Sequence, residues 1–229
     1  EPSDIILSHS FEALKVAMDG GILTITLNRP ERLNAFDETM KKEFAWLQRR
    51  LESNAEIRVI IIDAEGERAF CAGADVGWFE QDWETNRFRT EYRWIHDFFD
   101  TLERIEVPVI AAVHGVCACG GLELAMACDF AYSDTSAELG EPEILLSDAP
   151  PFLISPWVMG MRQAKHILLS GELVSAQTAL EYGILNRVCE PDDLEVTVTR
   201  MAKRLMGFAP ETWHQNKSAV NRSYEIMGF

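Results

Sequence analysis

Alternating apolar and polar positions predict a hairpin near the start of the chain. Segments 14–18 and 22–27 flank Asp19-Gly20-Gly21, and in the second segment threonines alternate with aliphatic residues. An aspartate followed by glycines between two such segments is typical of a tight turn between antiparallel strands. We therefore expect the chain to open with a two-stranded unit.

Three later segments predict further strands, because their apolar residues run without interruption. They are 58–63, 109–113 and the shorter 130–133. A continuous apolar run indicates a strand that is buried on both faces of a sheet. Such strands require helices on both sides of that sheet.

Apolar residues at helical spacing predict the covering layers. Asp37 is a plausible N-cap for a helix whose apolar stripe is Met40, Phe44, Leu47 and Leu51. A second stripe is Phe88, Tyr92, Ile95, Phe99 and Leu102, whereas Trp78, Phe79 and Trp83 fall outside it and are candidates to line a pocket. Further helices are expected at 162–170, 175–182, 194–206 and 211–226. Strands that alternate with helices, followed by helices alone, indicate an α/β layered domain.

Composition narrows the classes of partner. The 229 residues fit one large domain, and the net charge of -16 argues against nucleic acid or an anionic membrane surface as a partner. Five cysteines without a zinc-like spacing indicate reduced thiols and no metal site. No run of eighteen apolar residues and no signal-peptide pattern is present, so we expect a cytoplasmic protein.

The stretch 107–129 carries the first candidate chemistry. Its buried strand leads through a turn to Gly120 and Gly121, which open an apolar helix. Glycines let a ligand approach the backbone closely, and the free N–H groups of a first helical turn attract an oxygen that becomes negative. Glu123 lies in that turn as a candidate acid or base. Taken alone, the pattern also fits an ordinary glycine-packed helix with Glu123 in solvent.

Several motifs in order resemble the enoyl-CoA hydratase/isomerase (crotonase) superfamily. The resemblance covers nearly the whole chain, and the motifs together are more specific than any one of them. They are N-R-P-E-R-L-N-A-F at 28–36, A-F-C-A-G-A-D at 69–75, P-V-I-A-A-V-H-G at 108–115, G-G-L-E-L-A-M-A-C-D at 120–129, L-G-E-P-E-I-L-L at 139–146 and L-S-G-E-L-V-S-A-Q-T-A-L-E-Y-G-I-L-N-R-V at 169–188.

The resemblance implies a crotonase (ClpP-like) spiral of repeated ββα units over 1–190. It also implies that 191–229 is a helical region of the same domain that mediates a homotrimer or a dimer of trimers. Family members usually continue beyond the position of Phe229. The implied substrate is an acyl-CoA thioester, and no separate cofactor is expected.

The resemblance also assigns roles to individual residues. The two oxyanion-hole N–H groups fall on Ala74 and Gly120, which would hold the thioester oxygen as it becomes an enolate. Two hydratase glutamates fall on Glu123 and Glu143 and would bracket one water. Glu143 alone would also fit a surface glutamate, because Glu138 and Glu141 lie beside it. The residues expected to contact CoA are Arg32, Leu33, Ala35, Ala72, Gly73, Ala74, Asp75, Val76, Gly77 and Gly120.

One loop departs from the family pattern. The usual glycine-rich turn after Glu143 is replaced by Ser147-Asp148-Ala149-Pro150-Pro151-Phe152. Prolines restrict a loop that glycines would let fold tightly, so we expect a different acyl pocket floor. Asp148 is a candidate to enter the site.

The leading prediction is hydration of a 2-enoyl-CoA. A double-bond isomerase, or a hydrolase of a C–C or thioester bond, keeps the enolate site but uses the glutamates differently. A non-catalytic acyl-CoA-binding protein is the third alternative, and retention of both glutamates argues against it. Chain length of the acyl group, pathway and stereochemistry do not follow from the sequence.

Overall fold

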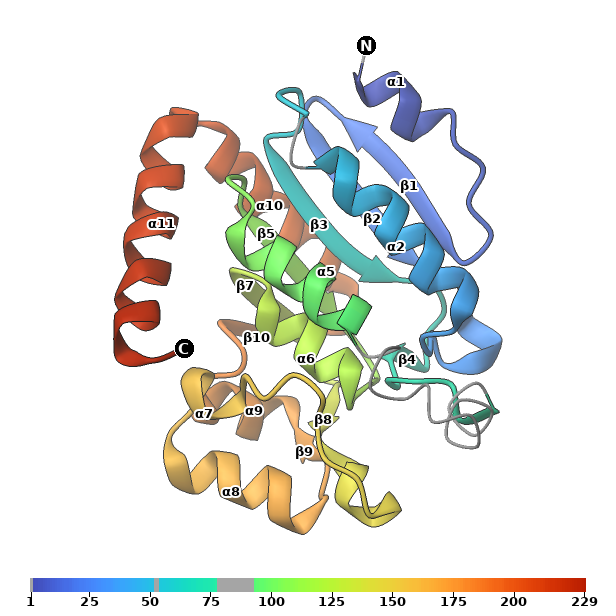
Figure 1. The fold of residues 1–229 in the computed structure, drawn as a ribbon, viewed down its shortest axis with the longest axis vertical. Helices are drawn as coiled ribbons and strands as arrows, with labels where there is room; N and C mark the ends of the chain where they lie inside the picture. Colours follow the sequence, from blue (N-terminus) through green and yellow to red (C-terminus); the bar gives the residue numbers. More distant parts are fainter. Residues whose placement is uncertain (1, 52–53, 78–92) are drawn as a thin grey trace.

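The computed structural model describes residues 2–51, 54–77 and 93–229 (Figure 1). The strands are β1 (Leu14–Asp19), β2 (Ile22–Leu27), β3 (Val59–Ala64), β4 (Ala69–Cys71), β5 (Val109–Val113), β6 (Val116–Ala118), β7 (Phe130–Asp134), β8 (Glu138–Gly140), β9 (Val174–Ser175) and β10 (Arg187–Cys189). The α-helices are α1 (Pro2–Leu7), α2 (Glu38–Leu51), α5 (Arg93–Arg104), α6 (Gly120–Ala127), α7 (Ser155–Val158), α8 (Met161–Ser170), α9 (Ala176–Tyr182), α10 (Leu194–Met206) and α11 (Pro210–Met227). Short 3₁₀ helices are η1 (Pro30–Arg32), η2 (Pro142–Leu146) and η3 (Pro191–Asp193).

The larger sheet has the strand order β1-β2-β3-β5-β7-β10. β1 pairs antiparallel with β2, and every later pair is parallel. The predicted hairpin is confirmed: Gly20 and Gly21 make its turn with φ of 55° and 96°, values that glycine adopts without steric cost. The strands predicted from continuous apolar runs are β3, β5 and β7.

A second, smaller sheet has the order β4-β6-β8-β9. β4, β6 and β8 are mutually parallel, and β9 adds an antiparallel edge. The chain therefore places one strand in the larger sheet, the next in the smaller sheet, and then a helical segment, three times in succession. This is the expected ββα spiral, and the predicted fold class is confirmed.

Both faces of the larger sheet are covered, as the apolar runs predicted. In β3, Ile60 and Ile62 join the core beneath α2, α5 and α6, whereas Val59 and Ile61 pack with α10. Figure 1 shows α2 and α5 on one side of this sheet and α10 on the other. Because successive side chains of a strand point to opposite faces, a strand between two helical layers must be apolar at every position.

The aromatic-rich segment is described only in its last part. Phe99 and Leu102 of α5 are buried in the core, as their spacing predicted. The predicted pocket residues Trp78, Phe79 and Trp83, and the predicted stripe residues Phe88 and Tyr92, lie outside the described residues.

The C-terminal helices occupy the predicted positions. α8, α9, α10 and α11 coincide within one residue with the expected ranges, and the domain boundary near residue 190 stays a prediction. α11 runs along the outside of the molecule and has no buried residue (Figure 1). Its Lys217 Nζ lies 2.7 Å from Asp129 Oδ2 and 2.9 Å from the carbonyl oxygen of Leu102, which anchors the helix to α5 and to the segment between α6 and β7. None of the described helices combines the length and apolarity needed to cross a membrane.

Candidate active site

The candidate residues follow three neighbouring strands of the smaller sheet. β4, β6 and β8 are parallel, with Cys71 opposite Cys117, and Ala118 opposite Gly140. The carboxyl ends of parallel strands meet at one edge of a sheet, and ligands of open α/β sheets bind there. Residues after β4, β6 and β8 therefore converge, and these include the predicted Ala74, Gly120 and Glu143.

Glycines bring the chain after β4 against the start of α6. A Cβ atom on Gly73 would lie 2.4 Å from Cys119 Cβ and 3.2 Å from the nitrogen of Gly120. A Cβ atom on Gly121 would lie 2.2 Å from the carbonyl oxygen of Cys71. Neither position has room for a side chain, so the two segments approach at backbone distance. The predicted oxyanion donors are brought together by this approach.

Among the described residues, the local pairing leaves the N–H of Ala74 without a partner. Phe36 and Ala74 form an isolated parallel bridge, in which Phe36 N donates to Gly73 O and Asp75 N donates to Phe36 O, both at 2.8 Å. Such a bridge uses the groups on either side of Ala74 and leaves its own N–H directed away from Phe36. Gly120 is the first residue of α6, where an N–H has no partner within the helix. Two donors thus face the same edge.

Glu123 lies in the first turn of α6 and is completely buried. Its Oε1 accepts a hydrogen bond of 2.7 Å from the N–H of Phe152, and its Oε2 has no partner among the described residues. The phenyl ring of Phe152 packs edge-on against Phe99, with ring centroids 5.3 Å apart. Glu123 is therefore held at one oxygen and open at the other, which suits a group that exchanges a proton.

Glu143 lies in η2, and its side chain is 7% exposed. The thiol of Cys119 and the carboxyl of Glu141 are its polar neighbours, and neither of its carboxyl oxygens has a hydrogen-bond partner among the described residues. The Asp148 N–H donates to the carbonyl oxygen of Glu143 at 3.0 Å, which ties the loop after η2 back onto it. The surface alternative for Glu143 is therefore wrong.

Burial raises the pKa of both predicted catalytic carboxyls. For Glu123, burial acts first and the negative charge of Glu143 adds to it, against the lowering effect of the Phe152 N–H. For Glu143, burial raises the pKa and hydrogen bonds from its surroundings oppose this. Neighbouring acids in a dry site do not all ionise together. One proton is therefore retained near working pH, as expected for an acid–base pair.

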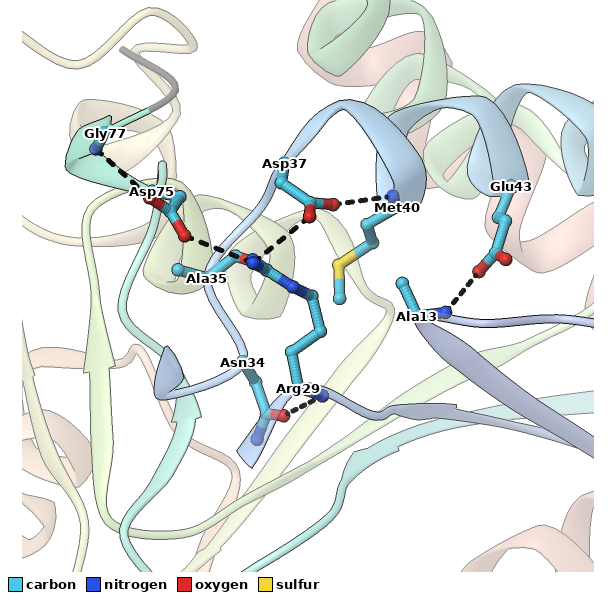
Figure 2. Close-up of polar contacts among 9 residues, drawn as sticks. All are labelled: Ala13, Arg29, Asn34, Ala35, Asp37, Met40, Glu43, Asp75 and Gly77. Atoms are coloured by element: carbon cyan, nitrogen blue, oxygen red, sulfur yellow. Dashed lines mark hydrogen bonds and ion pairs between the residues drawn. The ribbon is translucent and has the colours of Figure 1, made fainter. Parts of the chain in front are cut away.

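An arginine that the sequence analysis missed shapes the expected CoA loop. Arg29 Nη2 lies 3.1 Å from Asp37 Oδ2 and 3.2 Å from Asp75 Oδ2, and its backbone N–H donates to Asn34 Oδ1 at 2.8 Å. Figure 2 shows the guanidinium between the two carboxylates. The second oxygen of Asp75 accepts from Gly77 N. This network fixes segments 28–37 and 72–77 against each other.

The residues predicted to contact CoA fall on these two segments. Arg32 ends η1 and is exposed, whereas Leu33 adopts φ of 53° and Ala35 is buried. Ala72, Gly73 and Ala74 follow β4 directly, and Val76 is exposed. Leu33 O accepts from Ala72 N at 3.0 Å, so the two segments are joined. Binding of CoA by these residues stays a prediction.

The proline-bearing loop closes on the site in its own way. Ser147 adopts φ of 61° at the end of η2, and the first backbone N–H after Pro150 and Pro151 is that of Phe152. Proline has no N–H, so the donor to Glu123 has to come from beyond the two prolines. The expected difference in this loop is thus present, and Asp148, which is partly buried, adds negative charge beside Glu143.

Comparison with known proteins gives the family. The model of the enoyl-CoA hydratase/isomerase family matches residues 17–228. The chain belongs to this family. It is 33% identical to the short-chain-enoyl-CoA hydratase of Clostridium acetobutylicum, over 90% of this chain and 80% of that protein.

A second relative and a solved structure extend the comparison. The (E)-benzylidenesuccinyl-CoA hydratase of Thauera aromatica is 30% identical, over 86% of this chain and 77% of that protein. The crystal structure of an enoyl-CoA hydratase/isomerase from Xanthobacter autotrophicus Py2 superposes with a TM-score of 0.89 at 32% identity, covering 96% of this chain and 82% of that one. The predicted family and enzyme class are confirmed.

Proposed function

We propose that Glu123 and Glu143 add water across the double bond of a 2-enoyl-CoA thioester, with Ala74 and Gly120 holding the thioester oxygen. The hydratase activity itself was predicted from the sequence, and the family match and the relatives named hydratases bear it out. The observation that carries the assignment of residues is the convergence of two buried glutamates and two free N–H groups at one edge of the smaller sheet.

The proposed reaction balances with the groups present. The oxygen of a water attacks Cβ while one glutamate carboxylate takes a proton from that water. The π electrons of the double bond shift onto the thioester oxygen, which becomes an enolate between the Ala74 and Gly120 N–H groups. The other glutamic acid then delivers its proton to Cα, and the thioester carbonyl is restored. One such N–H donor contributes roughly 2.7 to 4 kcal/mol in comparable oxyanion holes.

Recognition of CoA is proposed for the surface that Arg29 organises. The guanidinium of Arg29 is matched by Asp37 and Asp75, so its charge is used within the protein. Arg32 is exposed nearby on η1. In a chain of net charge -16, a local cation is what a CoA phosphate requires. The proposed reaction then requires only the CoA ester and a water besides the protein.

The proposed assembly, implied by the family resemblance, is a homotrimer or a dimer of trimers. α11 presents Val220, Tyr224, Ile226 and Met227 to solvent within one helix that has no buried residue. Exposed apolar side chains gathered on one helix support an interaction site there. Sedimentation equilibrium would test it: a mass of three or six chains of 25.9 kDa supports the proposal, and a monomer at micromolar concentration contradicts it.

Product analysis tests the reaction. With crotonyl-CoA in ¹⁸O-labelled water, we expect 3-hydroxybutyryl-CoA that carries one labelled oxygen at Cβ. With a 3-enoyl-CoA, whose double bond is not conjugated with the thioester, we expect no product. Conversion of the 3-enoyl-CoA to its 2-isomer without label at Cβ would favour the isomerase alternative instead.

A further inference from the structure

A third buried glutamate adjoins the catalytic pair. Glu141 joins β8 to η2, is 1% exposed, and neither of its carboxyl oxygens has a hydrogen-bond donor among the described residues. The charged groups described around it are Glu123 and Glu143, and the thiols of Cys117 and Cys119 lie within its electrostatic reach. Its surroundings thus contain acids and neutral thiols.

The carboxyls of Glu141 and Glu143, two residues apart, are both buried and interact at close range, and none of their four oxygens has a hydrogen-bond partner among the described residues. An ionised carboxylate only accepts hydrogen bonds, so two of them at this range repel each other. In the described ranges, no group of three or more His, Cys, Asp and Glu side chains is arranged to hold a metal ion. The contact is favourable when one of the two carboxyls carries a proton.

We propose that Glu141 keeps a proton in the working enzyme and donates it in a hydrogen bond to Glu143, which makes Glu141 a positioning residue for the catalytic pair. The proposal rests on the proposed function, because Glu143 is one of the two glutamates assigned there. Glu141 is the more deeply buried partner, at 1% against 7% exposure, and therefore the one for which the charged form costs more.

The surroundings of the two carboxyls support this direction. The Cys119 thiol and the backbone N–H of Glu143 are close enough to its carboxyl to lower the pKa of Glu143 against the effect of burial. Burial first, and then the negative charges of Glu123 and Glu143, raise the pKa of Glu141. The proton of the pair consequently stays on Glu141, and Glu143 is fixed as a carboxylate facing the substrate water.

Three variants separate this role from simple packing. Glu141→Gln keeps a donor that cannot ionise, and Glu141→Leu keeps the volume without a donor. Glu138→Gln, at the exposed start of β8, is the matched control. We expect Glu141→Gln to retain kcat within about threefold and Glu141→Leu to lower it roughly 10- to 100-fold, the range of a hydrogen bond to a charged group. KM for crotonyl-CoA should stay within about threefold in each.

The pH profile carries the decisive readout. In the parent, alkaline pH removes the proton of Glu141 and places two negative charges side by side, so kcat falls. In Glu141→Gln the alkaline fall in kcat should occur about one pH unit or more higher than in the parent, because the amide does not titrate. Glu138→Gln should follow the parent. Equal loss of kcat in Glu141→Gln and Glu141→Leu with an unmoved profile, or parent-like behaviour of both, would overturn the proposal.

A spectroscopic measurement keeps this test separate from the proposed reaction. The infrared band of protonated carboxyl groups at neutral pH should be weaker in Glu141→Gln than in the parent, and this needs no turnover. If the parent fails to hydrate crotonyl-CoA but the band is lost in Glu141→Gln, the proposed reaction fails and the protonated Glu141 stands. A band of unchanged intensity would overturn the inference even in an active hydratase.

Discussion

Substitution of Gly73 by alanine should disable the oxyanion site without touching either glutamate. Gly73 has φ of 88°, and an added Cβ would lie 2.4 Å from Cys119 Cβ and 3.2 Å from the Gly120 nitrogen. Cys119 Cβ is fixed to the backbone, so it cannot swing aside as the end of a long side chain would. The chain after β4 must move away from α6, and the Ala74 and Gly120 donors separate.

The expected size of the effect follows from two costs. An alanine in the left-handed region costs roughly 1 to 2 kcal/mol, and overpacking in a tight interior costs roughly 1 to 3 kcal/mol. The free energy of unfolding of Gly73→Ala should therefore fall by about 2 to 5 kcal/mol. Loss of one aligned donor typically lowers kcat about 100- to 1000-fold.

Urea unfolding and steady-state kinetics with crotonyl-CoA measure both effects. Gly20→Ala is the matched control, because Gly20 also has positive φ, 55°, but an added Cβ meets nothing within 4 Å. Gly20→Ala should lose only the conformational cost of about 1 to 2 kcal/mol and keep the parent's kcat. A folded Gly73→Ala protein with the parent's kcat would refute the role of this backbone contact.

Three further predictions concern Cys119, Lys217 and Glu123. Cys119 has φ of 54° and ψ of -135°, a backbone conformation that is strained for residues with a Cβ atom. Cys119→Gly should therefore be more stable to urea than Cys119→Ala by about 1 kcal/mol or more, and the reverse order would show that the backbone is not strained there. Lys217→Met should lower the free energy of unfolding by roughly 2 kcal/mol, because it leaves the carboxylate of Asp129 without its cation. Adding Asp129→Asn to the Lys217→Met protein should restore part of this free energy, and no recovery in the double variant would contradict the explanation. The folded pKa of Glu123 is raised above 4.5, so the parent loses stability as pH rises from that value towards the raised one. Glu123→Gln should therefore melt higher than the parent at alkaline pH and show no such advantage in acid; a pH-independent difference would contradict this.

The sequence predicted the larger sheet and its helices because their residues repeat regularly. β5 is apolar at every position and β3 at every position except Asp63, and the apolar stripe of α2 follows helical spacing. The smaller sheet was expected only through the resemblance. Its strands have two or three residues, as β8 and β9 show, and so short a segment has no period to detect.

The candidate site could be predicted only in part, because some of its residues leave no local pattern in the sequence. Glu123 and Glu143 were found from motif context, but Glu141 appeared as one acid in a charged segment with Glu138. Its burial depends on packing between the end of β8 and the start of α6, which no local pattern records. The positive φ of Cys119 was also missed, because cysteine rarely adopts it and the tight contact with Gly73 imposes it here.

In the proposed reaction, Glu143 and Glu123 act together on one water. The most direct test is the loss of absorbance of the conjugated enoyl thioester, with crotonyl-CoA, in the parent, Glu123→Gln, Glu143→Gln, the double variant and Asp148→Asn. We expect each single Gln variant to lower kcat by roughly 100-fold or more with KM little changed, and the double variant to be scarcely slower than either single one. Asp148→Asn should stay within about threefold of the parent. Hydration that survives in Glu143→Gln but is lost in Asp148→Asn would contradict the account.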